Sequence, residues 1–155
     1  MTERALDMRD DPGIRRAGRL CVVSSVSSDA HTWNLSFLQL LLEEHGFDVI
    51  NLGACVPDEL LLETCRTYRP CAVVISTVNG HGRIDGLRLA RRFRDDPSLE
   101  HMPLVIGGKL GLTAGDSPAL RAQLIRAGFD AVFEDGDGTG PLLARLALLS
   151  PEGRR

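Results

Sequence analysis

The feature that most constrains the fold is a regular alternation of short apolar segments with longer helical ones from residue 19 onward. The short segments are rich in β-branched residues, which predicts strands at 20–24, 48–52, 72–76, 104–106 and 131–133. Between them apolar residues recur at helical spacing, which predicts helices over 35–45, 58–68, 84–94, 118–127 and 140–149. Gly46, Pro70 and Gly128 stand where three of these helices would end.

Strands that alternate with helices in this way form parallel pairs, because each crossover returns the chain to the same end of the sheet. Strands that are apolar along their whole length are typical of a sheet covered by helices on both faces. We therefore expect a single α/β domain, a flavodoxin-like (Rossmann-like) doubly wound five-stranded parallel sheet of order 2-1-3-4-5. In this order, ligands bind at the carboxyl ends of the first and third strands.

We expect this domain to span 19–150, between a flexible N-terminal arm at 1–18 and a flexible C-terminus at 151–155, since both ends lack apolar periodicity. A net charge of -3 gives no sign of a nucleic-acid partner. No apolar run approaches the roughly 18 residues that span a membrane, so we expect no membrane partner. The start of the chain has no apolar signal segment and the four cysteines form no C-x-x-C pair, which favours a cytoplasmic protein with reduced thiols.

Small and hydroxylated residues are concentrated in the three loops that should meet at the ligand-binding edge. After the first strand the chain reads Ser27-Ser28-Asp29-Ala30-His31-Thr32-Trp33-Asn34. The third strand leads into Ser76-Thr77-Val78-Asn79-Gly80, and the fourth ends in Gly107-Gly108. Small side chains leave room for a bulky group to enter between the strands, and hydroxyls can satisfy its polar atoms.

Asp29 and His31 form the pair with the clearest chemistry. An imidazole can bind a metal through one ring nitrogen while the other donates to a carboxylate, which fixes the tautomer. The pair therefore supports a single axial metal ligand. The simpler interpretation is that Asp29 caps the next helix and His31 faces solvent, and the spacing alone leaves both open.

The stretch from Asp29 to Asn34, followed by Ser76-Thr77-Val78 and Gly107-Gly108, resembles the cobalamin-binding signature D-x-H-x-x-G, S-x-L and G-G. The resemblance extends from about Leu20 to Leu149 and is to the cobalamin (B12)-binding domain family. Within that family, the segment Gly80-His81-Gly82-Arg83-Ile84-Asp85 is most similar to the small cobalamin-binding subunit of glutamate mutase (methylaspartate mutase).

The resemblance implies that adenosylcobalamin binds in the base-off/His-on mode. His31 would then replace the lower base of the cofactor as axial ligand of cobalt, with Asp29 bonded to its other nitrogen. The displaced nucleotide would enter a slot lined by Ser76, Val78, Gly107 and Gly108. The implied cofactor-binding residues are Ser27, Ser28, Asp29, Ala30, His31, Thr32, Trp33, Asn34, Ser76, Thr77, Val78, Gly80, Gly107 and Gly108.

The function implied is that of the cobalamin-binding small subunit of an adenosylcobalamin-dependent carbon-skeleton mutase, an isomerase of the L-glutamate to 3-methylaspartate type. The active site would form with a separate large TIM-barrel subunit, so this chain would hold no catalytic residue alone and would be inactive alone. The alternatives are a corrinoid methyl carrier, a cobalamin-sensing module without an isomerase partner, and a scaffold that has lost the cofactor.

Two residues depart from the family signature: Asn34 stands for its glycine and Val78 for its leucine. Asparagine tolerates left-handed backbone angles, so Asn34 would serve if the glycine is needed for its angle. It would weaken binding if a ligand presses on the Cα. Elsewhere, Arg88, Arg91 and Arg92 share one helix face, which we expect to be solvated. A receiver domain is disfavoured because Ser76 stands where its phosphorylated aspartate would be.

Overall fold

The computed structural model describes residues 19–78, 82–109, 117–134 and 137–149. The flexible ends that we expect at 1–18 and 151–155, and Gly80, lie outside these residues. The elements are β1 (Leu20–Ser24), α2 (Trp33–Glu44), β2 (Asp48–Asn51), α3 (Asp58–Tyr68), β3 (Ala72–Thr77), α4 (Gly82–Asp95), β4 (Leu104–Gly108), α5 (Ser117–Ala127), β5 (Ala131–Glu134) and α6 (Gly140–Leu149).

The strands form one parallel sheet of order β2-β1-β3-β4-β5, which confirms the predicted flavodoxin-like topology. The first and third strands are neighbours, so the chain leaves them toward opposite sides of the sheet at this point. In the register of β3 with β4, Ser76 lies opposite Gly107 and Thr77 opposite Gly108. Two parts of the sequence signature therefore lie side by side at the carboxyl edge.

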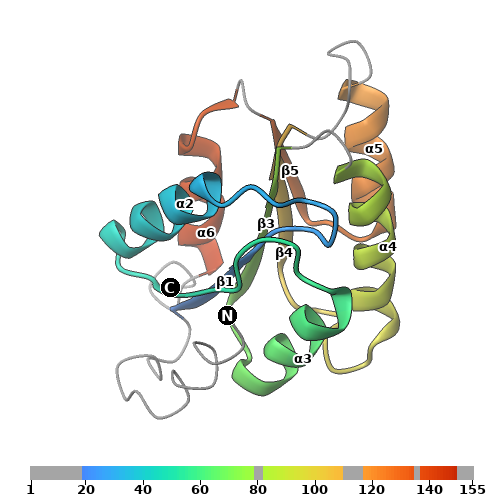
Figure 1. The fold of residues 1–155 in the computed structure, drawn as a ribbon, viewed down its shortest axis with the longest axis horizontal. Helices are drawn as coiled ribbons and strands as arrows, with labels where there is room; N and C mark the ends of the chain where they lie inside the picture. The colour runs from blue at the N-terminus through green and yellow to red at the C-terminus, as the bar shows by residue number, and fades with distance from the viewer. Residues whose placement is uncertain (1–18, 79–81, 110–116, 135–136, 150–155) are drawn as a thin grey trace.

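Helices cover both faces of the sheet (Figure 1): α2 and α6 lie on one face, and α3, α4 and α5 on the other. Successive strand residues point to opposite faces, so each strand contributes to two separate cores. On β1, Val22 joins the core beneath α3, α4 and α5, whereas Cys21 and Val23 join the core beneath α2 and α6. The second core is closed by Leu35 and Leu146 from its two helices.

The predicted elements agree with the structure except near their ends. β1, α3 and α6 have the predicted bounds, whereas α2 and α4 each begin two residues earlier than predicted. Their first residues are not part of an apolar stripe, so the helical period does not reveal them. Gly46 and Gly128 have φ of 87° and 135° and end their helices as predicted. Arg69, at φ 51°, ends α3 before Pro70.

In the described part of the chain, no helix combines the length and apolar character that crossing a membrane requires. All four cysteines are free thiols. Cys21 and Cys71 lie with their sulfur atoms 3.9 Å apart at the start of neighbouring strands. The pKa of the buried Cys21 thiol is raised by its hydrogen bond with Cys71 and by burial, so it stays protonated.

Candidate functional site

Asp29 is the centre of the hydrogen-bond network at the carboxyl edge of the sheet. Its side chain is fully buried, and each carboxylate oxygen accepts two hydrogen bonds. Oδ2 accepts from the hydroxyl of Thr77 and from the backbone N–H of Val78, both at 2.7 Å. Oδ1 accepts from the backbone N–H of His31 at 3.0 Å and from its ring at 2.7 Å. Asp29 therefore joins the β1–α2 loop to the end of β3.

The surroundings of Asp29 keep it ionised. Burial alone disfavours the charged form, but the hydrogen bonds from the His31 backbone, Thr77, Val78 and the His31 ring outweigh it. Together they lower the pKa of the carboxyl from 3.8 to about 2. An ionised carboxylate can only accept hydrogen bonds, so all of its bonding partners must be donors.

The charge on Asp29 fixes the tautomer of His31. Since Oδ1 of Asp29 accepts from Nδ1 of the ring, the proton of the neutral imidazole sits on Nδ1 and the lone pair on Nε2. The His31 side chain is 50% exposed. The structure thus holds an imidazole by one nitrogen and leaves the other with the character of a metal ligand.

The loop that bears this pair is also bound to the neighbouring loop between β2 and α3. The backbone N–H of Cys55 donates to the carbonyl of Asp29 at 2.8 Å, and the hydroxyl of Ser25 donates to the same carbonyl at 3.2 Å. Asp29 is therefore held through its backbone as well as its side chain, which restricts the position of His31.

Arg88 connects the same loop to two helices, which sequence reasoning missed. Its guanidinium, on α4, donates to Asp58 of α3 at 2.7 and 3.1 Å, to Asp85 at 2.9 Å and to the hydroxyl of Ser27 at 3.0 Å. Asp85 accepts in turn from the hydroxyl of Ser28. Arg88 is exposed, as expected for a solvated face, but it also bonds to partners on α3 and in the loop, which the sequence did not predict.

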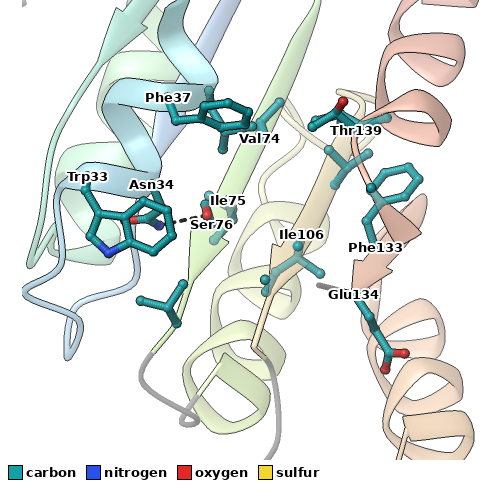
Figure 2. Close-up of a pocket in the computed structure, with 17 residues that line it drawn as sticks. Trp33, Asn34, Phe37, Val74, Ile75, Ser76, Ile106, Phe133, Glu134 and Thr139 are labelled. Carbon is teal, nitrogen blue, oxygen red and sulfur yellow. Dashed lines mark hydrogen bonds between the residues drawn. The ribbon is translucent and has the colours of Figure 1, made fainter. Parts of the chain in front are cut away.

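Beside the edge, a cavity of about 220 Å³ opens between α2 and α6 over the centre of the sheet. Figure 2 shows α2 on one side, β5 and the start of α6 on the other, and the strands between them. The side chains of its walls are mainly apolar or small. The walls are formed by Trp33, Asn34, Phe37, Leu38, Val74, Ile75, Ser76, Val78, Val105, Ile106, Gly107, Gly108, Phe133, Glu134, Gly138, Thr139 and Leu142. Roughly 300 Å³ or more is usual for a site that encloses a whole drug-sized ligand. The cavity therefore suits one arm of a larger molecule.

Asn34 contributes a buried amide to this wall. Its Nδ2 donates to the hydroxyl oxygen of Ser76 at 2.8 Å (Figure 2). Asn34 lies in the first turn of α2 and is not among the described residues with positive φ. The idea that asparagine replaces the family glycine for a left-handed angle is therefore wrong, because the backbone here is helical. What the substitution changes is the space and polarity of the wall.

The two glycines of β4 differ in what they are needed for. Gly108 has φ of 105°, and a Cβ there would overlap the carbonyl oxygen of Thr77. At Gly107 a Cβ would come within 3.3 Å of the carbonyl oxygen of Phe133, a tight but smaller conflict. Gly108 is thus required by the packing of β4 on β3 itself, and both glycines line the cavity.

The structure divides the predicted site residues that it describes into three groups. Those that line the cavity are Trp33, Asn34, Ser76, Val78, Gly107 and Gly108. Asp29, His31 and Thr77 form the hydrogen-bonded group beside it, and Ala30 and Thr32 are their neighbours in the chain. The hydroxyls of Ser27 and Ser28 bond to residues of α4, toward the face away from the cavity.

Sequence reasoning missed the far wall of the cavity, formed by Phe133, Gly138, Thr139 and Leu142. Phe133 lies in the fifth strand, and Gly138, Thr139 and Leu142 follow it, at the same edge of the sheet as the others. The topology predicts that the site lies at this edge. The residues predicted to form it, however, follow only the first, third and fourth strands, so those of the fifth strand were not included. The β5–α6 connection was the available signal, since it must also lie at the carboxyl edge.

Comparison with known proteins supports the assignment of the family. The model of the family described as B12 binding domain matches residues 19–144. Glutamate mutase sigma subunit 1 of Haloarcula marismortui is 31% identical over 116 residues, which are 75% of this chain and 76% of that protein.

Among solved structures, the monomethylamine corrinoid protein of Methanosarcina barkeri superposes with a TM-score of 0.67 at 15% identity, over 94% of this chain and 65% of that one. The signal receiver domain of a histidine kinase from Syntrophus aciditrophicus gives a TM-score of 0.62 at 16% identity, over 86% of this chain and 92% of that one. At these identities both likenesses show the fold alone.

The fold is thus shared by proteins of different kinds, and the family is identified by the sequence matches. The family match covers most of the chain, including the loop with Asp29 and His31, and the similarity to a glutamate mutase sigma subunit covers three quarters of it. The chain belongs to the B12-binding domain family, and its relatives within that family include the sigma subunits of glutamate mutase.

Proposed function

We propose that this chain is the cobalamin-binding small subunit of an adenosylcobalamin-dependent carbon-skeleton mutase of the glutamate mutase type, working in the cytoplasm. It would bind the cofactor base-off/His-on through His31 and complete an active site with a separate large TIM-barrel subunit. The relation to a glutamate mutase sigma subunit supports the reaction type.

The observation that carries the proposal is the state of His31. One ring nitrogen donates to the buried carboxylate of Asp29, and half of the side chain is exposed. A histidine that binds a metal through one nitrogen commonly donates the other N–H to a carboxylate, which raises its basicity as a ligand. The ring is therefore held in the tautomer that leaves Nε2 to act as the ligand of cobalt.

The cavity supports the base-off part of the proposal. If His31 takes the lower axial position, the nucleotide that normally occupies it must go elsewhere. A cavity of about 220 Å³ with small and apolar walls lies between α2 and α6, next to the loop that carries His31. Gly107 and Gly108, which carry no side chain, form part of its wall. These features fit the nucleotide arm of a corrinoid.

The chemistry that adenosylcobalamin supplies when bound is the homolytic cleavage of its cobalt–carbon bond. The residues of this chain bind and orient. Asp29 fixes the tautomer of His31, and Thr77 and the Val78 N–H hold Asp29 in place. The residues of the cavity would hold the nucleotide arm of the cofactor. The large subunit would enclose the substrate and exclude water from the radicals.

Two alternatives share the same binding geometry: a corrinoid methyl carrier and a cobalamin-sensing module without an isomerase partner. The fold likeness to a monomethylamine corrinoid protein is the observation that keeps the first in view. Both differ from the mutase in what happens after binding, so a binding measurement alone does not separate them.

Reconstitution separates them. The chain, a large mutase subunit from the same source, and the two together are incubated with adenosylcobalamin and L-glutamate, and 3-methylaspartate is measured by chromatography. We expect product only from the mixture, and none when the chain carries His31→Ala. His45→Ala is the matched control, because His45 lies exposed at the end of α2 and should leave turnover unchanged.

Turnover by this chain alone would contradict the division of labour between two subunits. A mixture in which the chain binds the cofactor and associates with the large subunit, but forms no product, would favour the carrier or sensor.

A further inference from the structure

At the amino edge of the sheet, two cysteines lie in contact at the starts of neighbouring strands. Sγ of Cys21 and Sγ of Cys71 are 3.9 Å apart. The backbone N–H of Cys71 donates to the carbonyl of Leu20 at 2.7 Å, and Cys21 lies opposite Ala72 in the register of β1 with β3. The sheet itself therefore holds the two thiols together, although 50 positions separate them in the chain.

The geometry of the pair is close to that of a disulfide. A disulfide joins sulfur atoms about 2.05 Å apart, so the two atoms would have to approach by roughly 2 Å. Rotation about the Cα–Cβ bonds moves a cysteine sulfur over distances of this order. Both thiols belong to the core beneath α2 and α6, whereas Cys65 belongs to the core on the other face and Cys55 lies exposed in the β2–α3 loop.

The two thiols differ in their access to solvent. Cys71 is partly exposed, whereas Cys21 is fully buried. The hydrogen bond with Cys71 and burial both raise the pKa of Cys21, so Cys21 does not react with a solvent oxidant by itself. An oxidant therefore reaches Cys71 first and finds the second thiol directly behind it.

We propose that Cys21 and Cys71 form a redox modification site, at which a reversible intramolecular disulfide links the starts of β1 and β3 when the chain meets a peroxide. The site requires neither the cofactor nor a partner subunit, so it is independent of the proposed function. In a reducing compartment, thiol reductants keep the pair in the dithiol form that the structure shows.

Two balanced steps lead to the disulfide. The sulfur of Cys71 attacks one oxygen of hydrogen peroxide, the O–O bond breaks, and a sulfenic acid and one water form. The sulfur of Cys21 then attacks the sulfur of the sulfenic acid, and the S–O bond breaks as the S–S bond forms. The departing hydroxyl takes the proton of the Cys21 thiol and leaves as a second water. Two thiols and one peroxide thus give one disulfide and two waters.

The disulfide is expected to stabilise the fold. A cross-link between residues 50 positions apart restricts the unfolded chain, and it joins two segments that the folded chain already pairs. We expect the midpoint of thermal unfolding to rise by roughly 5–10 °C in the oxidised chain.

The test is oxidation of the folded full chain with hydrogen peroxide, followed by alkylation of the remaining thiols in denaturant and mass spectrometry without reductant. Trypsin and a glutamate-specific protease place the four cysteines on different peptides. We expect a peptide pair linked through Cys21 and Cys71, a loss of two hydrogen atoms from the intact chain, and reversal of both by dithiothreitol.

Three variants make the result specific. Cys71→Ser and Cys21→Ala should each abolish the linked pair and the rise in the unfolding midpoint. Cys71→Ser disturbs the core less, because that residue is only partly buried. Cys55→Ser is the matched control: it removes an exposed thiol outside the pair and should leave both readouts unchanged. Thermal unfolding of the reduced variants checks that each is folded.

Complete alkylation of Cys21 and Cys71 after peroxide treatment would overturn the inference. So would a Cys71 that is oxidised to the sulfinic acid while Cys21 stays a thiol, because the two sulfurs would then not meet. Disulfides formed only between two chains through Cys55 would count against it as well. A linked pair that lowers the unfolding midpoint would also contradict it, since the bond would then distort the sheet.

Discussion

At the scale of the residue, the site depends on a single buried charge. Asp29 is held by four hydrogen bonds from His31, Thr77 and Val78, and its pKa of about 2 keeps it ionised at any pH near neutrality. The carboxylate therefore acts on His31 at every such pH. Its effect can be measured with a substitution that removes the charge but keeps the shape of the side chain.

Asp29→Asn is expected to weaken corrinoid binding by about 10–100-fold, the usual effect of losing the carboxylate behind a metal-binding histidine. The amide brings two donors to a position where all four neighbouring groups donate, so it can no longer satisfy them or polarise the ring. Absorbance titration with hydroxocobalamin measures the effect.

Asp130→Asn is the matched control for this change. Asp130 also accepts a backbone N–H, that of Leu104 at 2.8 Å, but at the start of β4 on the opposite edge of the sheet. Equal affinities for the Asp29 and Asp130 variants would mean that Asp29 only caps the loop.

At the scale of the element, α4 does more than cover the sheet. Through Arg88 it contacts α3 at Asp58 and the β1–α2 loop at Ser27, and through Asp85 it contacts the same loop at Ser28. The loop that carries His31 is therefore fixed from both sides, by the end of β3 through Asp29 and by α4 through these contacts.

Replacing Arg88 by leucine is expected to raise the corrinoid dissociation constant by about three- to tenfold and to lower the free energy of unfolding by about 1–2 kcal/mol. Two largely buried carboxylates, Asp58 and Asp85, would lose a donor. The binding effect would arise because the loop becomes freer to move. Urea unfolding and absorbance titration measure the two effects separately.

Arg92→Leu provides the comparison, because Arg92 also binds α3, through Glu59 and Asp58, and its bonds in the described part of the chain do not reach the loop. It should affect stability with little effect on corrinoid affinity. If both arginine variants bind corrinoid equally well, α4 does not position the loop.

At the scale of the whole molecule, the sequence was sufficient for the topology and for the central pair. The alternation of strand and helix patterns predicts the sheet order, because right-handed crossovers leave few alternatives. The contact between Asp29 and His31 was one of two interpretations that the spacing left open, and their position in the loop after the first strand favoured it.

Features that depend on packing between distant segments could not be predicted in the same way. The far wall of the cavity comes from Phe133 and Leu142, whose relation to α2 depends on how two helices rest on one sheet face. The bonds of Arg88 depend equally on the placement of α3 against α4. The backbone angle of Asn34 was left open by the sequence, because the first turn of α2 carries no apolar stripe that marks it as helical.

The central claim is a bond between cobalt and Nε2 of His31, and nitrogen hyperfine splitting in electron paramagnetic resonance tests it most directly. The chain is labelled with nitrogen-15 in its histidines only, loaded with cob(II)alamin, and compared with the unlabelled chain. We predict that labelling converts the triplet splitting of each cobalt line to a doublet, and that His31→Ala abolishes this response. A triplet that persists in the labelled chain would mean that cobalt retains its own lower base, and would contradict the account.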